Sequence, residues 1–198
     1  MTQCPAVTMS TTRHNEVVRA VGQMMRAVGW DARSGENAAW FRKRPDLRPF
    51  DLLYRVDPSD KWTGIDVGIG DPTRFGSAPT GQHYLLSGQA STNLVQRKNN
   101  AFYNNLRLYG PLKAPTKFQP VGFEATGGQG VEARKLLRSI FAAAEEAKAK
   151  VPRSQWSWSA QTFSAHWQQR LSFEIAKYTA ITVLLGARKI AAAEASCD

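Results

Sequence analysis

Cysteine is almost absent from this sequence. The 198 residues include two cysteines, Cys4 and Cys197, which stand at opposite ends of the chain. Two cysteines placed in this way exclude a disulfide framework and a zinc site made from four cysteines of one chain. The three histidines, His14, His83 and His166, have none of the close spacings that a histidine metal motif requires.

Long apolar segments are also missing. The longest clearly apolar run, ITVLLGA over residues 181–187, is far shorter than the ~20 residues of a membrane-spanning helix. The first residues do not combine a basic segment with an apolar one, so the sequence indicates no secretion signal. We therefore expect no membrane partner and an intracellular location.

Acidic residues are few relative to basic ones. The chain has 16 Asp and Glu residues against 26 Lys and Arg residues, which gives a formal net charge of +10. An excess of this size favours a polyanionic partner, above all nucleic acid. The basic residues do not form a dense tail, so we expect the charge to be spread over a folded surface. An inert basic surface, or a structural domain with an interaction role only, remains the alternative.

The apolar pattern predicts an α/β protein with a small mixed sheet flanked by helices. Residues 1–12 are polar and aperiodic, and we expect them to form a flexible arm before a single domain over residues 13–198. Helices are predicted from His14 to Gly29 and over residues 87–109, 131–150 and 160–195, the last with a break near Gly186.

Three segments have the composition of strands, namely residues 50–56, 62–69 and 118–125. The first two are joined by the turn Asp57-Pro58-Ser59-Asp60, which predicts an antiparallel hairpin. The charged residues 31–49 predict an irregular loop.

Two aspartates in this hairpin are the first candidates for chemistry. Asp51 stands at the start of one strand, and Asp66 follows in the next strand, where Ile65 and Val67 face the opposite way. Carboxylates that face each other repel unless a divalent cation lies between them, and oxygen ligands suit Mg²⁺ or Mn²⁺. The alternative is that both aspartates are ordinary turn or edge residues.

A lysine on the next predicted helix is a further candidate for the same site. At about 100° per residue, Lys98 falls in the middle of an apolar face that includes Leu94 and Phe102. A lysine embedded in such a face either extends along it to reach water or serves an acidic site. Both interpretations remain open at this point.

Residues suited to phosphate contact occur in two places. The densest basic loop is flanked by Trp40 and Phe41, and two polar residues precede Lys98 on the helix. The candidate nucleic-acid contacts are Arg42, Lys43, Arg44 and Arg48 in the loop and Gln96 and Arg97 on the helix. A solvated loop without function is the alternative for the first group.

The order of these residues resembles the PD-(D/E)XK nuclease superfamily. It is more closely similar to the restriction-enzyme-like endonuclease domain of site-specific non-LTR retrotransposons. The shared pattern is the run Arg48-Pro49-Phe50-Asp51, then Asp66, then a lysine on the following helix instead of two residues after the second acid. The segments RHNEVV, PVGFEATGGQG and WQQRLSFEIAK are also similar, so the resemblance covers roughly residues 13–194.

The resemblance implies a restriction-endonuclease-like core and a metal-dependent DNA endonuclease that nicks target DNA, with Mg²⁺ or Mn²⁺ as cofactor. Asp51 and Asp66 would hold the metal, and Glu36 would add a carboxylate or orient a metal-bound water. Lys98 would stabilise the scissile phosphate or help to deprotonate the water. The resemblance also implies DNA and the reverse transcriptase portion of a longer parent polyprotein as partners, and a nuclear location in a eukaryote.

The sequence departs from the family pattern in two respects. The family places a tyrosine four residues after its helical lysine, whereas this chain has Phe102 there and Tyr103 one position later. A second Arg-Pro-Asp run ends at Asp46, but its spacing to Asp66 is longer than the family's, so Asp51 is the preferred ligand. These departures leave open a catalytically inactive nucleic-acid-binding module on the same fold.

Overall fold

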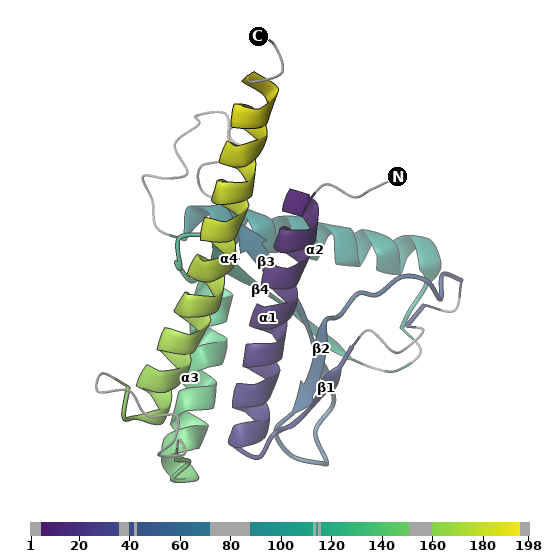
Figure 1. The fold of residues 1–198 in the computed structure, drawn as a ribbon. Helices are drawn as coiled ribbons and strands as arrows, with labels where there is room; N and C mark the ends of the chain where they lie inside the picture. Colours follow the sequence, from purple (N-terminus) through teal and green to yellow (C-terminus); the bar gives the residue numbers. More distant parts are fainter. Residues whose placement is uncertain are drawn as a thin grey trace.

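A computed structural model of the chain describes residues 5–35, 40–41, 43–71, 88–112, 114, 116–150 and 160–194. Over these residues the chain forms four helices and one four-stranded mixed sheet (Figure 1). The elements, in chain order, are α1 (Pro5–Ala27), β1 (Asp31–Ser34), β2 (Leu52–Arg55), β3 (Thr63–Gly70), α2 (Gln89–Tyr109), β4 (Lys117–Glu124), α3 (Val131–Glu146) and α4 (Phe163–Glu194). The predicted α/β class with a small mixed sheet is confirmed.

The strands lie in the order β1-β2-β3-β4. β1 pairs antiparallel with β2, β2 pairs antiparallel with β3, and β3 pairs parallel with β4. The β2–β3 pair confirms the predicted hairpin, with Leu52 opposite Ile65. Helix α2 forms the crossover that a parallel β3–β4 pair requires.

Helices cover both faces of the sheet (Figure 1). On one face, α1 and α3 contribute Val17 and Ile140 to a core that includes Val67 of β3, and α4 packs along α1. On the other face, Phe102 of α2 stacks on Phe118 of β4, with ring centroids 4.0 Å apart. The sheet thus separates two apolar clusters, as the alternation of side chains along a strand requires.

The two faces of β3 differ in kind. Ile65 and Val67 are fully buried in the cluster beneath α1. Asp66 and Gly68 alternate with them and face α2. Lys98 of α2 pairs with Asp66, and its stem lies over Gly68. The predicted orientation of Ile65 and Val67 away from Asp66 is therefore confirmed.

Glycines on this face let α2 lie close to the sheet. A Cβ on Gly68 would lie 2.4 Å from Leu94 Cδ2, and a Cβ on Gly122 would lie 2.6 Å from the backbone oxygen of Ser91. Real Cβ atoms do not approach so closely, so any larger residue would push the helix outward. The small residues set the distance at which α2 side chains meet β3.

The start of α2 is fixed from the end of β4. The buried carboxylate of Glu124 accepts the backbone N–H groups of Ala90 at 3.1 Å and Ser91 at 3.5 Å. These N–H groups have no partner within the helix, and Gly88 at the N-cap has no side chain to offer. Glu124 thereby replaces the usual capping side chain and complements the helix dipole.

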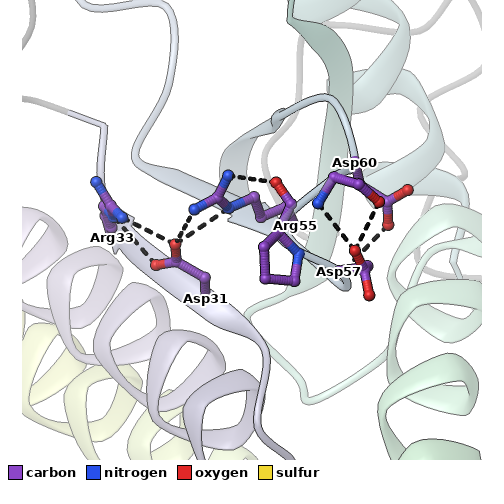
Figure 2. A network of polar contacts seen from close by, with 7 residues as sticks. Asp31, Arg33, Arg55, Asp57 and Asp60 are labelled. Carbon is purple, nitrogen blue, oxygen red and sulfur yellow. Dashed lines mark hydrogen bonds and ion pairs between the residues drawn. The ribbon is translucent and has the colours of Figure 1, made fainter.

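β1 is a strand that the sequence analysis assigned to a loop. Its residues, Asp-Ala-Arg-Ser, have little intrinsic strand preference. Figure 2 shows what holds it: Asp31 accepts hydrogen bonds from Arg33 and from Arg55 of β2, over distances of 2.8–3.1 Å. Arg55 also donates to the carbonyl of Pro58 at 2.7 Å. Pairing with β2 and these ion pairs override the local preference.

The first helix begins earlier than predicted. Residues 5–12 are helical, so the flexible arm expected over residues 1–12 is wrong for this part. The periodic apolar pattern begins only where α1 reaches the core, which is why it indicated His14.

The last helix runs through Gly186 without the predicted break. One glycine costs a helix interior about 1 kcal/mol, which a long helix tolerates. Although α4 has 32 residues, neither it nor any other described helix has the length of apolar sequence needed to cross a membrane.

The close approach of α2 leads to a testable prediction. We expect Gly122→Ala to lower the free energy of unfolding by about 1–3 kcal/mol, because the added methyl group meets a backbone oxygen that cannot rotate away. Gly186→Ala is the control, since nothing lies within 4 Å of its Cβ position. It should raise the free energy of unfolding by about 0.5–1 kcal/mol. Urea unfolding followed by circular dichroism measures both, and equal effects would contradict the tight α2–sheet contact.

Candidate active site

The strand register places Asp51 opposite Asp66. Leu52 pairs with Ile65, and the backbone N–H of Asp51 donates to the Ile65 carbonyl at 2.8 Å. One step further along this antiparallel pair brings the two aspartates together, as the sequence predicted. Burial raises the pKa of Asp66, the nearby Asp51 raises it further, and Lys98 opposes both effects.

Lys98 reaches this pair from α2. Its Nζ forms an ion pair with Asp66 Oδ1, and the two side chains are only 22% and 24% exposed. The lysine stem crosses Gly68, where a Cβ would lie 2.8 Å from Lys98 Cε. The predicted direction of Lys98, from the apolar helix face toward the sheet, is confirmed.

A side chain that the sequence analysis did not select, His14, reaches the site from α1. Its Nε2 lies 3.2 Å from Asp51 Oδ2 and 3.1 Å from the backbone oxygen of Val67. The N–H of Val67 donates to the same Asp51 oxygen at 2.6 Å. Both partners of Nε2 are acceptors, so Nε2 carries the hydrogen. The hydrogen bond to Asp51 is the main cause that raises the pKa of His14 to about 8.

One sequence signal could have identified His14. It lies three residues before Val17 and seven before Val21, both fully buried, so it heads the apolar stripe of α1. The same observation, a titratable residue on an apolar stripe, identified Lys98. Tests of histidine spacing missed His14 because its partners are an aspartate and a backbone carbonyl on other elements.

The site therefore holds two carboxylates and two cationic side chains. The cations come from helices on opposite faces of the sheet, His14 from α1 and Lys98 from α2 (Figure 1). They meet where β2 begins, so Asp51 lies beside β3 without being inside a regular strand. Pairing of this kind offsets the cost of partly burying each charge.

The oxygen atoms of the site suit a divalent cation. Asp51 Oδ2 and the Val67 carbonyl oxygen both face the point that His14 Nε2 occupies, and the Asp66 carboxylate is adjacent. Carboxylate and carbonyl oxygens are preferred ligands of Mg²⁺ and Mn²⁺. Across the described part of the chain, no group of three or more His, Cys, Asp or Glu residues is arranged to hold a metal. A cation here would therefore need the Val67 carbonyl.

The other candidate acids do not add to this cluster. Glu36, the third metal ligand expected from the resemblance, lies outside the described residues. Asp46 is exposed and forms a two-pronged ion pair with Arg44, at 2.9 and 2.7 Å. This agrees with the choice of Asp51 over Asp46 as the partner of Asp66.

Neither aromatic residue after Lys98 reaches the site. Phe102 is buried in the apolar cluster beside Phe118, and Tyr103 is 59% exposed. Neither residue therefore takes the place of the tyrosine that the resemblance predicts four residues after Lys98. Phe102 packs α2 against the sheet instead.

The candidate nucleic-acid contacts differ in their solvent exposure and in whether an acidic residue already pairs with them. Arg42 lies outside the described residues, while Lys43 and Arg48 are exposed in the same loop, and Gln96 and Arg97 are exposed on α2. Arg44 is held by Asp46, and its guanidinium lies 5.3 Å from the centre of the Tyr109 ring. Its charge is already partly compensated, so we expect Arg44 to contribute less to phosphate binding than its exposed neighbours.

Comparisons with known proteins do not assign the chain to a family. No family model matches it, and no curated protein matches it. The interpretation of the site therefore depends on its own geometry and chemistry.

The hydrogen bond of His14 predicts a pH-dependent contribution to stability in the metal-free protein. The pKa of His14 rises from 6.5 to about 8 in the folded state, which therefore holds the proton more tightly. The stabilisation is complete below pH 6.5 and is lost as the pH rises through 8. A rise of this size corresponds to about 2 kcal/mol, which partial exposure of the ring reduces to about 1 kcal/mol.

Urea unfolding of the wild type and of His14→Asn, in the presence of a chelator, measures this effect. The difference between their free energies of unfolding should be largest near pH 6 and should shrink toward about pH 9. The other two histidines are common to both proteins and cancel. A difference that does not change with pH would contradict the prediction.

Proposed function

We propose that this chain is a metal-dependent DNA endonuclease of the PD-(D/E)XK type, similar to the endonuclease domain of site-specific non-LTR retrotransposons. The convergence of Asp51, Asp66 and Lys98 carries this proposal. Three residues selected from the sequence, one just before β2, one on β3 and one on α2, meet at one point of a small mixed sheet. Such a cluster of carboxylates with one lysine is suited to phosphodiester hydrolysis.

The role of each residue follows from its contacts. A divalent cation bound by these oxygens would lower the pKa of an attacking water and neutralise charge on the scissile phosphate. Asp51 is held in position by the Val67 N–H, so its second oxygen has a fixed direction. Lys98 can donate from Nζ to a phosphate oxygen beside Asp66, or assist removal of the water proton.

The charge of the chain supports DNA as the substrate. The net charge of +10 attracts the phosphate backbone. Gln96 and Arg97 are exposed on α2, and they stand immediately before Lys98 in the chain. A backbone that contacts Arg97 would therefore run past the end of the catalytic lysine. Lys43 and Arg48 can contact phosphates further along the strand.

The displaced lysine does not favour the inactive module. A lysine two residues after Asp66 would stand at position 68, which is glycine here. Lys98 Cε passes 2.8 Å from where the Cβ of residue 68 would be. The ammonium from α2 thus approaches Asp66 through the space that a strand-borne lysine would use.

Removal of either aspartate tests the proposed function. We expect Asp51→Asn and Asp66→Asn each to slow Mg²⁺- or Mn²⁺-dependent nicking of supercoiled plasmid on the order of 100-fold or more, because each loses a charged ligand. DNA binding should survive or tighten, since a negative charge next to the phosphate disappears. Asp60→Asn, an identical change in the exposed β2–β3 turn, should cut at the wild-type rate.

Full nicking by the Asp51→Asn/Asp66→Asn double variant would exclude this site. Wild-type protein that binds DNA with a steep salt dependence, and nicks it with neither cation, would favour the inactive module.

Lys98→Met tests the lysine separately. Methionine keeps the apolar stem against Leu94 and Gly68 but removes the ammonium. We expect the protein to fold and single-turnover cleavage to slow about 100-fold or more, the usual effect of losing one transition-state donor. Lys98→Arg should restore only part of the rate, because a planar guanidinium needs more room over Gly68.

The matched control is Arg97→Met, which removes the same charge one residue earlier. It should weaken DNA binding and lower the log–log salt slope by about 0.9, with little change in the cleavage rate of bound DNA. A folded Lys98→Met protein that cuts at the wild-type rate would make Lys98 a packing residue.

A further inference from the structure

The face of α4 that points away from the core is apolar. Leu171 and Ile175 face inward, where each is only 2% exposed. On the opposite face six apolar residues are exposed, and we call them the α4 stripe: Phe173, Ala176, Ala180, Val183, Leu184 and Ala187. A helix that is apolar on both faces is normally buried on both, whereas the described residues cover only one face of this helix.

The α4 stripe has the spacing of a surface that pairs with another helix. Five of its residues follow one another at steps of three, four, three and four, namely Phe173, Ala176, Ala180, Val183 and Ala187. Residues that join the helices of a coiled coil have the same alternation of steps. The stripe is about 21 Å long at 1.5 Å per residue. A contiguous exposed apolar surface of this kind indicates an interaction site.

The stripe is open on the outside of the molecule. α4 packs along α1 and α3, and these two helices contact the sheet (Figure 1). Lys177 borders the stripe, but its Nζ lies 4.8 Å from the centre of the Tyr178 ring, on the side away from the apolar residues. A partner bound to the stripe would therefore leave Asp66 and Lys98 accessible on the far side of α1.

A second copy of α4 fits the stripe when the two helices run antiparallel. If a two-fold axis passes beside Ala180, Phe173 meets the partner's Ala187, and Leu184 meets the partner's Ala176. Each bulky side chain then lies against an alanine, and the two Ala180 residues let the helices approach closely. In a parallel pair Phe173 would meet its own copy, and the alanines would face each other across a gap.

The charged residues beside the stripe suit the same arrangement. Glu174 and Arg188 lie on the same edge of the stripe at about 100° per residue. The antiparallel pair brings Glu174 next to the partner's Arg188, once on each side of the axis. Glu174 Oε2 is buried without a hydrogen-bond partner among the described residues, and Arg188 is exposed. Arg170, on the same edge, is turned back onto the Trp167 ring at 5.0 Å. A guanidinium from the second copy would thus compensate a carboxylate that is poorly satisfied in one copy.

We propose that the α4 stripe joins two copies of this chain, which run antiparallel about a two-fold axis at Ala180. The inference goes beyond the proposed function and requires neither DNA nor a metal ion. Pairing two such stripes removes on the order of 1,000 Å² of surface from water, which is near the lower limit for a specific interface. We therefore expect a weak dimer with a Kd in the micromolar range.

Sedimentation velocity of the full chain tests the dimer. A reductant keeps Cys4 and Cys197 from forming disulfides between copies. The average mass should rise from 21.9 kDa toward twice this value as the protein concentration increases from about 1 to about 200 µM.

Ala180→Arg tests the interface. It places two guanidinium groups at the axis, and we expect the Kd to increase about 100-fold or more. The variant should fold normally, because Ala180 is exposed and arginine is a good helix former. The matched control is Ala142→Arg, the same change at an exposed position of α3, which should dimerise like the wild type.

Disulfide formation tests the direction of the helices. In a Cys4→Ser/Cys197→Ser background, Ala180→Cys should form a disulfide-linked dimer under mild oxidation, because the two cysteines meet at the axis. Ala187→Cys should not, since its two copies lie about 21 Å apart in the antiparallel pair. A parallel pair would be linked at both positions.

Three results would overturn the inference. They are a wild-type protein that remains a monomer at the highest concentration, a folded Ala180→Arg protein that dimerises like the wild type, and equal cross-linking through positions 180 and 187. Because these measurements use neither DNA nor a metal ion, each of these results would leave the proposed function as it stands.

Discussion

The compensation of two neighbouring carboxylates is the constraint on which the site depends. Asp51 and Asp66 lie on adjacent segments and are mostly shielded from water. Partial burial of a carboxylate is costly unless a positive group lies beside it. The chain supplies one cation from each face of the sheet, His14 from α1 and Lys98 from α2. Both helices must therefore be placed accurately for each carboxylate to have its partner.

The placement of α2 follows from residues that take no part in the ion pairs of the site. Gly68 and Gly122 allow the helix to lie against β3 and β4, and Glu124 fixes its first turn. Lys98 follows two to three turns later on the same face. A lysine side chain is flexible, but its approach over Gly68 confines the stem to one path. Steric contacts of the glycines thus determine where the ammonium meets Asp66.

Much of the site could be predicted from the sequence because it depends on two local patterns, the spacing within a hairpin and the periodicity of one helix. An antiparallel hairpin with a short turn fixes its own register, so the pairing of Asp51 with Asp66 follows from spacing. Lys98 was a candidate because a charge interrupts an apolar helix face, although this pattern left open whether its side chain reaches water or an acidic site. The Val67 carbonyl was not evident, since every residue has one. His14 was missed because its partners lie 37 and 53 positions away and belong to elements that meet only in the fold.

The errors in the fold have the same origin. β1 has no strand-like composition, and it forms because β2 offers a pairing edge and Arg55 reaches across to Asp31. The first turns of α1 are helical although their sequence has no regular apolar period. Where tertiary contacts decide the structure, local propensity gives the wrong answer.

Stability and proposed chemistry use the same atoms in this site. Lys98 neutralises Asp66 in the metal-free fold, and it is also the group proposed to contact the scissile phosphate. His14 pairs with Asp51 from the opposite face of the sheet. A divalent cation held by Asp51 and Asp66, as the proposed function requires, would compensate both carboxylates, and Lys98 would then be available to a phosphate. Lys98 would thus exchange its ion pair with Asp66 for a contact with the phosphate. His14 and Lys98, which pair with the two carboxylates, thus already lie beside the proposed reaction site.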